Sequence, residues 1–278
     1  MPFEDLLIEH ATFITFDTET TGLYPVASRL IEIGAVRFRM DGEEISVFEQ
    51  LIDPGTSIPP DAQAVNHITD EMVSGQPGVD DVLPAFLDFL GGTDNVLIAH
   101  NARFDMAFIG VDLVRMGLPL PGHMVLDTVQ LARSLAPGLS TYSLEPLSRA
   151  LGIARDQEHR ALSDARLTKE VFRELVRRNP GVRAVKDLAG IAAAAAFGQS
   201  SNQRVTTPPG YESLEDAIIR GAVVEIVYEG GTRGEEPRGL TPYAFLQAGG
   251  YVYLAGRCHI DGRNKMYRLD RIRSYRVL

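Results

Sequence analysis

The sequence is short of cysteine, of positive charge and of long apolar runs. Cys258 is the single cysteine among 278 residues, which excludes an internal disulfide framework and a zinc site built on clustered cysteines. No segment approaches the roughly 20 consecutive apolar residues that span a bilayer. Residues 1–10 carry acids instead of the basic start of a secretory signal. These absences predict a soluble cytoplasmic protein that does not associate with membranes.

The shortage of positive charge is uneven along the chain. Asp and Glu number 37 against 27 Lys and Arg, a net charge of −10. Residues 1–180 hold 27 acids and 14 bases, whereas residues 181–278 hold 10 acids and 13 bases. An acidic protein gains no long-range attraction for nucleic acid from its average field. A nucleic-acid partner would therefore be met by a local basic patch or by metal ions.

Hydrophobic patterning divides the chain into three parts. We predict a domain over 1–180, a helical or flexible linker over 181–210, and a small β-rich domain over 211–278. In the first domain, a meander of three strands precedes strands that alternate with helices, which indicates an α/β sheet of mixed direction. Its expected strands cover 12–16, 30–39, 45–52, 95–99 and 124–126, and its main helices cover 79–90, 102–116, 128–135, 143–151 and 162–178. The last domain is expected to hold a helix at 213–220 and strands near 222–229, 243–247, 251–255, 265–270 and 274–277.

Four acids fall where such a sheet could gather them. Asp17 and Glu19 are expected at the end of the first strand, and their i, i+2 spacing points both carboxylates to one face. Asp105 follows a buried strand, and Asp164 opens the last helix of the domain. Taken alone, Asp17 and Glu19 could equally be two solvated loop acids. Taken alone, Asp105 and Asp164 are explained as acids that complement a helix dipole. The strand pair, however, costs stability through repulsion unless a cation holds it.

Three ordered motifs resemble those of the DEDDh 3′→5′ exonucleases, a group of the ribonuclease-H-like superfamily that includes proofreading epsilon subunits. The motifs are Asp17-Thr18-Glu19, Asn101-Ala102-Arg103-Phe104-Asp105 and His159-Arg160-Ala161-Leu162-Ser163-Asp164. The resemblance extends over residues 10–178. It implies a ribonuclease-H-like mixed five-stranded sheet with flanking helices.

The resemblance also implies a catalytic site with two divalent cations, Mg²⁺ or Mn²⁺. Asp17, Glu19 and Asp164 would bind the first ion, Asp17 would bridge to the second, and Asp105 would hold the second. Hard divalent cations prefer oxygen ligands, and four carboxylates balance their charge. His159 would be the general base, since an imidazole with a pKa near ~6.5 can accept a proton around neutral pH.

By the same resemblance, two groups of residues would contact the terminal nucleotide. They are Thr20, Gly22 and Leu23 on one side, and His100, Asn101 and Phe104 on the other. Leu and Phe are core residues by default, so contact with substrate is an open alternative to burial for both. Asp127 is expected to be the N-cap of the helix 128–135 instead of a fifth metal ligand.

The last domain resembles a WYL domain, a small SH3/Sm-like β-barrel of bacterial regulators. The matching segments are Arg238–Tyr243, Val252–Gly256 and Tyr267–Ile272, with Val252 in place of the tryptophan. The resemblance implies a basic patch that binds nucleic acid or a regulatory ligand. Its members would be Arg238, Arg257, Arg263, Lys265, Arg268 and Arg271. The alternative is a solvated charged edge strand that limits aggregation.

The sequence therefore predicts a metal-dependent 3′→5′ exonuclease that releases nucleoside 5′-monophosphates from single-stranded or frayed DNA. Two alternatives stay open: an exoribonuclease of the same superfamily that trims RNA, and a non-catalytic nucleic-acid-binding regulator. The presence of all five catalytic residues favours an enzyme. The WYL resemblance favours repair, defence or regulation over proofreading. The sequence specifies neither a polymerase partner nor an oligomeric state.

Overall fold

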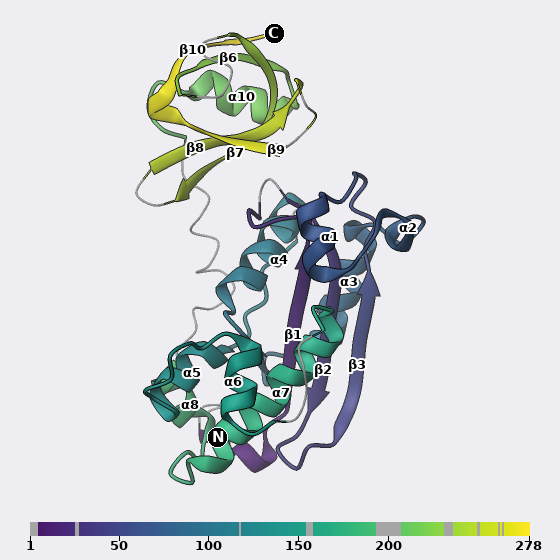
Figure 1. Cartoon of the computed structure of the whole chain (residues 1–278), viewed down its shortest axis with the longest axis vertical. Coiled ribbons are helices and arrows are strands. Elements are labelled where there is room, and N and C mark those ends of the chain that lie inside the picture. The colour runs from purple at the N-terminus through teal and green to yellow at the C-terminus, as the bar shows by residue number, and fades with distance from the viewer. Residues whose placement is uncertain are drawn as a thin grey trace. The chain divides into compact units, whose positions relative to one another are not determined.

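The computed structural model describes residues 5–25, 28–116, 118–153, 158–192, 207–230, 236–248, 251–260, 262 and 264–278. The chain divides into two compact units (Figure 1). One unit comprises Met1–Thr21 and Leu30–Ser200, and the other comprises Gly22–Arg29 and Ser201–Leu278. Within the described ranges, no helix is both long enough and apolar enough to cross a membrane.

The first unit is built on a five-stranded sheet in the order β3-β2-β1-β4-β5. The strands are β1 (Phe13–Thr20), β2 (Leu30–Phe38), β3 (Glu44–Leu51), β4 (Val96–Ala99) and β5 (Val125–Asp127). β1, β2 and β3 pair antiparallel, whereas β4 and β5 run parallel to β1. The predicted mixed sheet is confirmed. β1 extends beyond the predicted 12–16, because its polar end, Asp17–Thr20, also pairs with β2.

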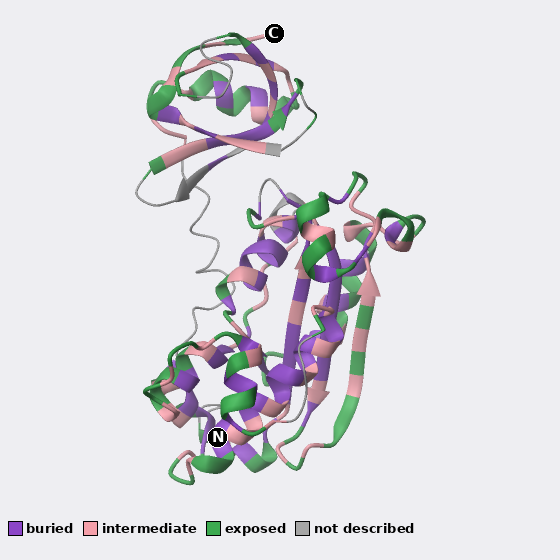
Figure 2. Ribbon diagram, in the orientation of Figure 1, coloured by how far each residue is buried: buried purple, intermediate pink, exposed green. Residues whose placement is uncertain are grey.

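Helices flank both faces of this sheet (Figure 2). The longer ones are α3 (Val79–Leu90), α4 (Arg103–Arg115), α5 (Thr128–Leu135), α6 (Leu144–Ala150), α7 (Ala161–Arg178) and α8 (Val185–Ala192). The short ones are η2 (Ile8–His10), α1 (Pro60–Asn66) and α2 (Asp70–Val73). α1 and α2 were not predicted, because so few residues give no periodic stripe. α8 falls in the predicted linker, and its Val185 and Leu188 are buried in a hydrophobic core of the first unit.

The alternation of side chains along β1 separates two hydrophobic cores. Phe13 belongs to the core shared with α5, α6, α7 and α8, and its ring centroid lies 5.0 Å from that of Phe172 in α7. Phe16 points the other way, into the core shared with α3 and α4. Because strand side chains have a period of two, Asp17 lies on the α7 face and Thr18 lies on the α4 face.

Helix α7 begins directly on strand β2 at a glycine. Gly34 is the β2 partner of Asp17, and a Cβ at Gly34 would collide with the backbone of Ala161 and Leu162. Only glycine therefore lets the first turn of α7 reach the sheet. This approach places Asp164, in the same turn, beside the polar end of β1.

The second unit contains a five-stranded antiparallel sheet in the order β10-β6-β7-β8-β9. Its elements are α10 (Glu212–Arg220), β6 (Val224–Tyr228), β7 (Arg238–Ala248), β8 (Tyr251–Cys258), β9 (Asn264–Arg268), η4 (Leu269–Arg271) and β10 (Ile272–Val277). Leu214 and Ala217 of α10 pack into the core of this sheet. β7 begins earlier than predicted. Pro242 argues against a strand in the sequence, but here it coincides with a register shift between β7 and β8. The antiparallel sheet is observed, and its closure into a barrel stays a prediction.

Replacing Gly34 by alanine should push α7 away from β2. We expect Gly34→Ala to lower the free energy of unfolding by about 1–3 kcal/mol, because extra atoms in a packed interior force strain. The same variant should weaken Mn²⁺ binding, since Asp164 moves with α7. Urea denaturation and calorimetric titration with Mn²⁺ measure the two effects.

Gly181→Ala is the matched control, because a Cβ there meets nothing within 4 Å. Equal stability and equal Mn²⁺ affinity of the two variants would show that α7 does not depend on Gly34.

Candidate metal centre and active-site cleft

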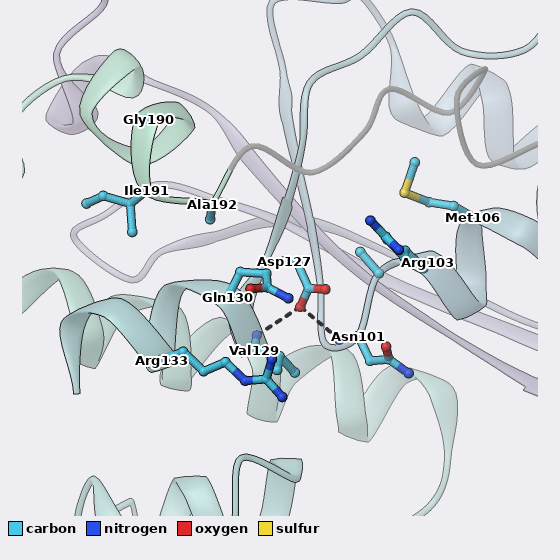
Figure 3. Close-up of a pocket in the computed structure, with 11 residues that line it drawn as sticks. Asn101, Arg103, Met106, Asp127, Val129, Gln130, Arg133, Gly190, Ile191 and Ala192 are labelled. Carbon is cyan, nitrogen blue, oxygen red and sulfur yellow. Dashed lines mark hydrogen bonds between the residues drawn. The ribbon is translucent and has the colours of Figure 1, made fainter. Parts of the chain in front are cut away.

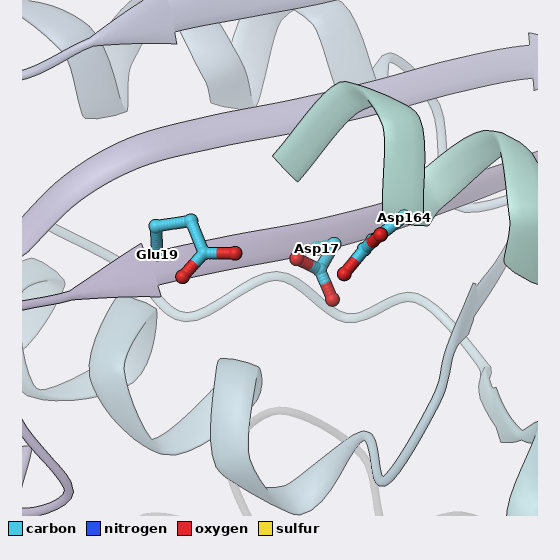
Figure 4. A group of neighbouring side chains, drawn as sticks. All are labelled: Asp17, Glu19 and Asp164. Carbon is cyan, nitrogen blue, oxygen red and sulfur yellow. The ribbon is translucent and has the colours of Figure 1, made fainter. Parts of the chain in front are cut away.

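Three carboxylates from two elements converge in the first unit (Figure 4). Asp17 and Glu19 extend from β1, and Asp164 extends from the first turn of α7. One oxygen of each can be chosen so that all three lie within 4.8 Å of one another. Asp164 is 2% exposed, while Asp17 and Glu19 keep some exposed surface. The group is thus closed on the α7 side and accessible from the other.

Asp105 joins this region from the opposite face of the sheet. β4 pairs with β1 only as far as Thr15, so β1 continues beyond its neighbour. There Asp105 Oδ1 accepts hydrogen bonds from the backbone amide of Thr18 at 2.9 Å and from its hydroxyl at 2.7 Å. Asp105 is 2% exposed and is not a member of the group of three carboxylates. The two bonds orient its side chain along the part of β1 that β4 does not pair with.

An ion pair that the sequence analysis missed anchors the start of α7. The carboxylate of Glu32, in β2, is fully buried and accepts hydrogen bonds from one side chain and one backbone amide. The guanidinium of Arg160 donates at 2.6 Å from Nη2, and the amide of Ala161 donates at 2.9 Å. Glu32 is also the β2 partner of Glu19. The ion pair therefore brings the guanidinium of Arg160 next to the acids and fixes the position of Arg160, which follows His159.

The protein environment disfavours the charged forms of these acids. Burial raises the pKa of Asp17 well above its usual range, and the charge of Asp105 raises it further. Burial and neighbouring carboxylates raise the pKa of Glu19 to about 9, although Arg160 opposes the effect. Burial also raises the pKa of Asp105 to about 7 against the hydrogen bonds that lower it. A bound cation would remove this penalty, so the donor set fits a divalent metal ion.

His159 is placed next to the anchored turn but is not part of the carboxylate group. It lies five residues before Asp164, and its backbone has a left-handed φ of 51°. A non-glycine residue in this region is uncommon. A strained backbone of this kind persists where neighbouring structure holds it in place. Here the ion pair with Glu32 holds Arg160, the residue that follows His159.

A cleft of about 620 Å³ opens beside Asp17. His100 and Asn101 line it together with Arg133 of α5 and Tyr142, which precedes α6. The ring of His100 bonds the Thr128 hydroxyl at 2.8 Å through Nδ1. Burial lowers the pKa of His100 to about 4, so the imidazole is neutral around pH 7. The wall formed by Arg133 and Tyr142 was not predicted, because neither residue belongs to a motif that the sequence analysis used.

The remaining expected contact residues differ in their exposure. Thr20 is buried at the end of β1, and its carbonyl accepts a bond of 3.4 Å from Asn66. Leu23 lies in the segment after Gly22 and is 74% exposed. Phe104 is partly buried and packs on Phe108, with ring centroids 4.9 Å apart. Of these two apolar residues, Leu23 is therefore the more accessible.

The basic residues expected to form one patch on the second unit do not share one face of its sheet. Directly paired residues of antiparallel strands point to the same side. Lys265 lies two residues before buried Tyr267 in β9, so its side chain points to the core side of the sheet. Arg268 of β9 and Arg257 of β8 point to the opposite, outer side by the same register. Arg238 pairs with Ile226, a core residue. It is only 8% exposed.

The basic residues also differ in whether neighbouring side chains already engage them. Arg268 bonds Asp270 at 2.6 Å, and its guanidinium carbon lies 3.5 Å from the centroid of the Tyr251 ring. Arg271 is exposed in η4. Arg263 lies outside the described residues. Arg257 and Arg271 are therefore the more accessible cations of the set.

Comparison with known proteins identifies relatives of both units. Residues 14–172 match the exonuclease family model RNase_T, and residues 210–277 match the WYL domain model. The DNA polymerase III subunit epsilon of Treponema pallidum is 41% identical over 170 residues, which cover 60% of this chain and 78% of that protein. The PolC-type DNA polymerase III of Clostridium perfringens is 43% identical over 161 residues, 58% of this chain but only 11% of that polymerase.

Solved structures show the same fold. Exonuclease X in complex with 5′-overhanging duplex DNA has a TM-score of 0.51 and 28% identity, and the match covers 64% of this chain and 98% of that chain. E. coli exonuclease I in complex with a dA16 oligonucleotide has a TM-score of 0.56 and 17% identity, with 89% of this chain and 55% of that chain covered.

The sheet and the carboxylate group together define a nuclease domain of ribonuclease-H-like fold. The chain belongs to the RNase_T exonuclease family: its first domain is a 3′→5′ exonuclease domain homologous to the polymerase III epsilon subunit, and a WYL domain follows it. The resemblance inferred from the motifs is confirmed.

The raised pKa of Glu19 predicts how metal-free protein responds to pH. The folded pKa of about 9 exceeds the ordinary value of 4.5, so between these values the folded state holds a proton that the unfolded chain has lost. The free energy of unfolding should therefore fall as pH rises through this window. Glu19→Gln removes this contribution. Urea denaturation in EDTA should show the wild-type protein losing at least about 1 kcal/mol more than the variant from about pH 5 to pH 9.

Exposed Glu43 provides the control, and Glu43→Gln should follow the wild-type protein. If Glu19→Gln kept the wild-type pH dependence, Glu19 would be ionised in the folded protein and the electrostatic description of the site would be wrong.

Proposed function

We propose that this chain is a metal-dependent 3′→5′ exonuclease that hydrolyses phosphodiester bonds at the 3′ ends of single-stranded or frayed DNA and releases nucleoside 5′-monophosphates. The observation that carries the proposal is the group of Asp17, Glu19 and Asp164. Buried carboxylates are normally paired with a cation. Three that converge beside a cleft lined by Asp17 therefore favour a metal-binding function over a structural one.

The acids of the first unit would hold two divalent ions, Mg²⁺ or Mn²⁺. Asp17, Glu19 and Asp164 would bind the first ion, and Asp17 and Asp105 would bind the second. All of these ligands are carboxylate oxygens, which hard divalent ions prefer. When bound, the ions would act as Lewis acids that stabilise the attacking and leaving oxygens of a phosphoryl displacement. Thr18 supports this assignment, because its two hydrogen bonds orient Asp105.

His159 would serve as the general base that accepts a proton from the attacking water. Its left-handed backbone and the adjacent anchored Arg160 support this role. His159 lies five residues before Asp164, which is in the first turn of α7. A general base must lie within reach of the proton it removes, and the proposal requires His159 to do so.

The terminal nucleotide would lie between two groups of residues, Thr20, Gly22 and Leu23 on one side and His100, Asn101 and Phe104 on the other. His100 and Asn101 line the cleft beside Asp17, and the Thr128 hydroxyl holds the imidazole of His100 through Nδ1. Exposed Leu23 offers an apolar surface for a base. Phe104 contributes less, since its ring already packs on Phe108.

DNA is the favoured substrate, because the relatives named above are DNA polymerase subunits and the solved structures hold DNA. The carboxylates and His159 would cleave RNA by the same chemistry, so an exoribonuclease is the second candidate. A non-catalytic regulator is disfavoured, because it would have no need for the repelling acids. The WYL domain favours repair, defence or regulation. The cytoplasmic location stays a prediction, and no polymerase partner or oligomeric state is proposed.

The WYL domain would bind nucleic acid or a regulatory ligand through Arg257 and Arg271, on a sheet that closes into an SH3/Sm-like barrel. Its curvature supports closure. Tyr228 in β6 and Tyr267 in β9 pack with ring centroids 5.0 Å apart, although β7 and β8 separate their strands in the sheet. Such an approach requires the sheet to curl back toward itself.

Degradation of an end-labelled single strand in Mg²⁺ or Mn²⁺ tests the proposed function. The wild-type chain should remove nucleotides from the 3′ end, and EDTA should stop the reaction. Asp17→Asn should reduce the rate to background, and His159→Ala should reduce it by about 10²- to 10⁴-fold, the usual contribution of a general base. Asp61→Asn, at an exposed position of α1, is the control and should leave the rate unchanged. Parallel assays with matched DNA and RNA decide the substrate.

Cleavage that persists in EDTA or in Asp17→Asn would contradict the proposal.

Strand binding by Asp17→Asn also tests the WYL domain. Adding Arg257→Glu and Arg271→Glu should weaken binding and flatten its salt dependence. Adding Arg220→Glu, on α10, should not.

A further inference from the structure

A second pocket adjoins the cleft that holds Asp17. Its volume is about 610 Å³, and it lies among the turn before α4, helix α5 and the end of α8 (Figure 3). Asn101, Val129 and Arg133 line this pocket and the cleft as well. The two cavities therefore meet at these side chains, and a ligand that fills the cleft can continue into the pocket.

Asp127 fixes the two walls of the pocket relative to each other. Its Oδ1 accepts hydrogen bonds from the amides of Asn101 at 3.0 Å and Val129 at 2.9 Å (Figure 3). The second bond makes Asp127 the N-cap of α5, as the sequence predicted. The first holds Asn101 in a left-handed backbone with φ of 61°. Arg133 lies four residues after Val129 and shares its helix face. One carboxylate thus positions both Asn101 and Arg133.

The pocket carries two arginines from different helices. Arg103 comes from α4 and Arg133 from α5. In the described part of the chain, neither forms an ion pair. The guanidinium of Arg133 lies 5.8 Å from the centroid of the Tyr142 ring, a contact that restrains it between the pocket and the cleft. Asp127 is the acidic lining residue, and its Oδ1 is already occupied by two amides.

We propose that this pocket holds the nucleic-acid strand upstream of the scissile nucleotide, with Arg133 binding the phosphate nearest the metal centre and Arg103 binding the following phosphate. The proposal rests on the proposed exonuclease function. Residues 1–180 are strongly acidic, so strand binding near the carboxylates needs local cations. Arginine presents a planar fork that matches a phosphate bidentately. Met106 and Ile191 add apolar lining for sugar or base.

Equilibrium binding in EDTA tests the proposal without requiring hydrolysis. The probes are labelled single-stranded DNA of about twelve nucleotides and an unlabelled trinucleotide that competes with it. Each phosphate contact should contribute about 0.7 to the slope of log affinity against log salt concentration. Arg133→Gln should lower that slope by this amount and weaken both probes roughly tenfold. Arg103→Gln should weaken the long strand alone, because the two phosphates of the trinucleotide are the scissile one and the one that Arg133 binds.

Arg149→Gln is the control, since Arg149 is exposed on α6 and pairs with Glu145. Unchanged slopes in both Arg133→Gln and Arg103→Gln would overturn the proposal. A free nucleoside 5′-monophosphate offers the same phosphate chemistry, so its binding is measured too. If the two variants lost nucleotide binding and kept strand binding, the pocket would be a product site and the strand proposal would be wrong. Absence of hydrolysis by the wild-type chain would contradict only the proposed function, because binding is measured separately.

Discussion

Mutual repulsion among buried carboxylates is the constraint on which the first unit depends. Asp17, Glu19 and Asp164 converge within 4.8 Å, and burial in protein strengthens their repulsion. Nothing in ordinary packing favours such a group, so neighbouring structure must hold it together. The main restraints are the β1–β2 register and the buried Glu32–Arg160 ion pair. A divalent cation would turn the same repulsion into binding energy, which links the cost in stability to the proposed catalytic role.

The approach of α7 to the sheet depends on small local features. Gly34 lets the first turn of the helix reach β2, and the amide of Ala161 bonds Glu32 there. Below this turn, Phe172 packs against Phe13 and holds the rest of the helix on the same face. On the far side, Thr18 orients Asp105 because β1 outruns β4. The acids therefore come from three elements, β1, α4 and α7, and the site exists only when the sheet and both helices are assembled.

The sequence predicts the parts of this arrangement that local patterns encode. Alternation and helical stripes indicate the mixed sheet and the longer helices, and the spacing of motifs indicates the acids. Contacts set by tertiary register were not predictable. Glu32 and Arg160 are 128 residues apart, and no local pattern marks them as partners. The two faces of the WYL sheet likewise follow from the pairing of β8 with β9. Arg133 was missed because its significance comes from a cavity, which a linear pattern does not contain.

The proposed function requires the carboxylates of β1, α4 and α7 to hold a pair of divalent cations. Anomalous diffraction from crystals of the wild-type chain soaked in Mn²⁺ would locate these ions. Two manganese peaks are expected, one among Asp17, Glu19 and Asp164 and one between Asp17 and Asp105. Crystals with full Mn²⁺ access to the cleft and no anomalous peak at these carboxylates would contradict the proposed function.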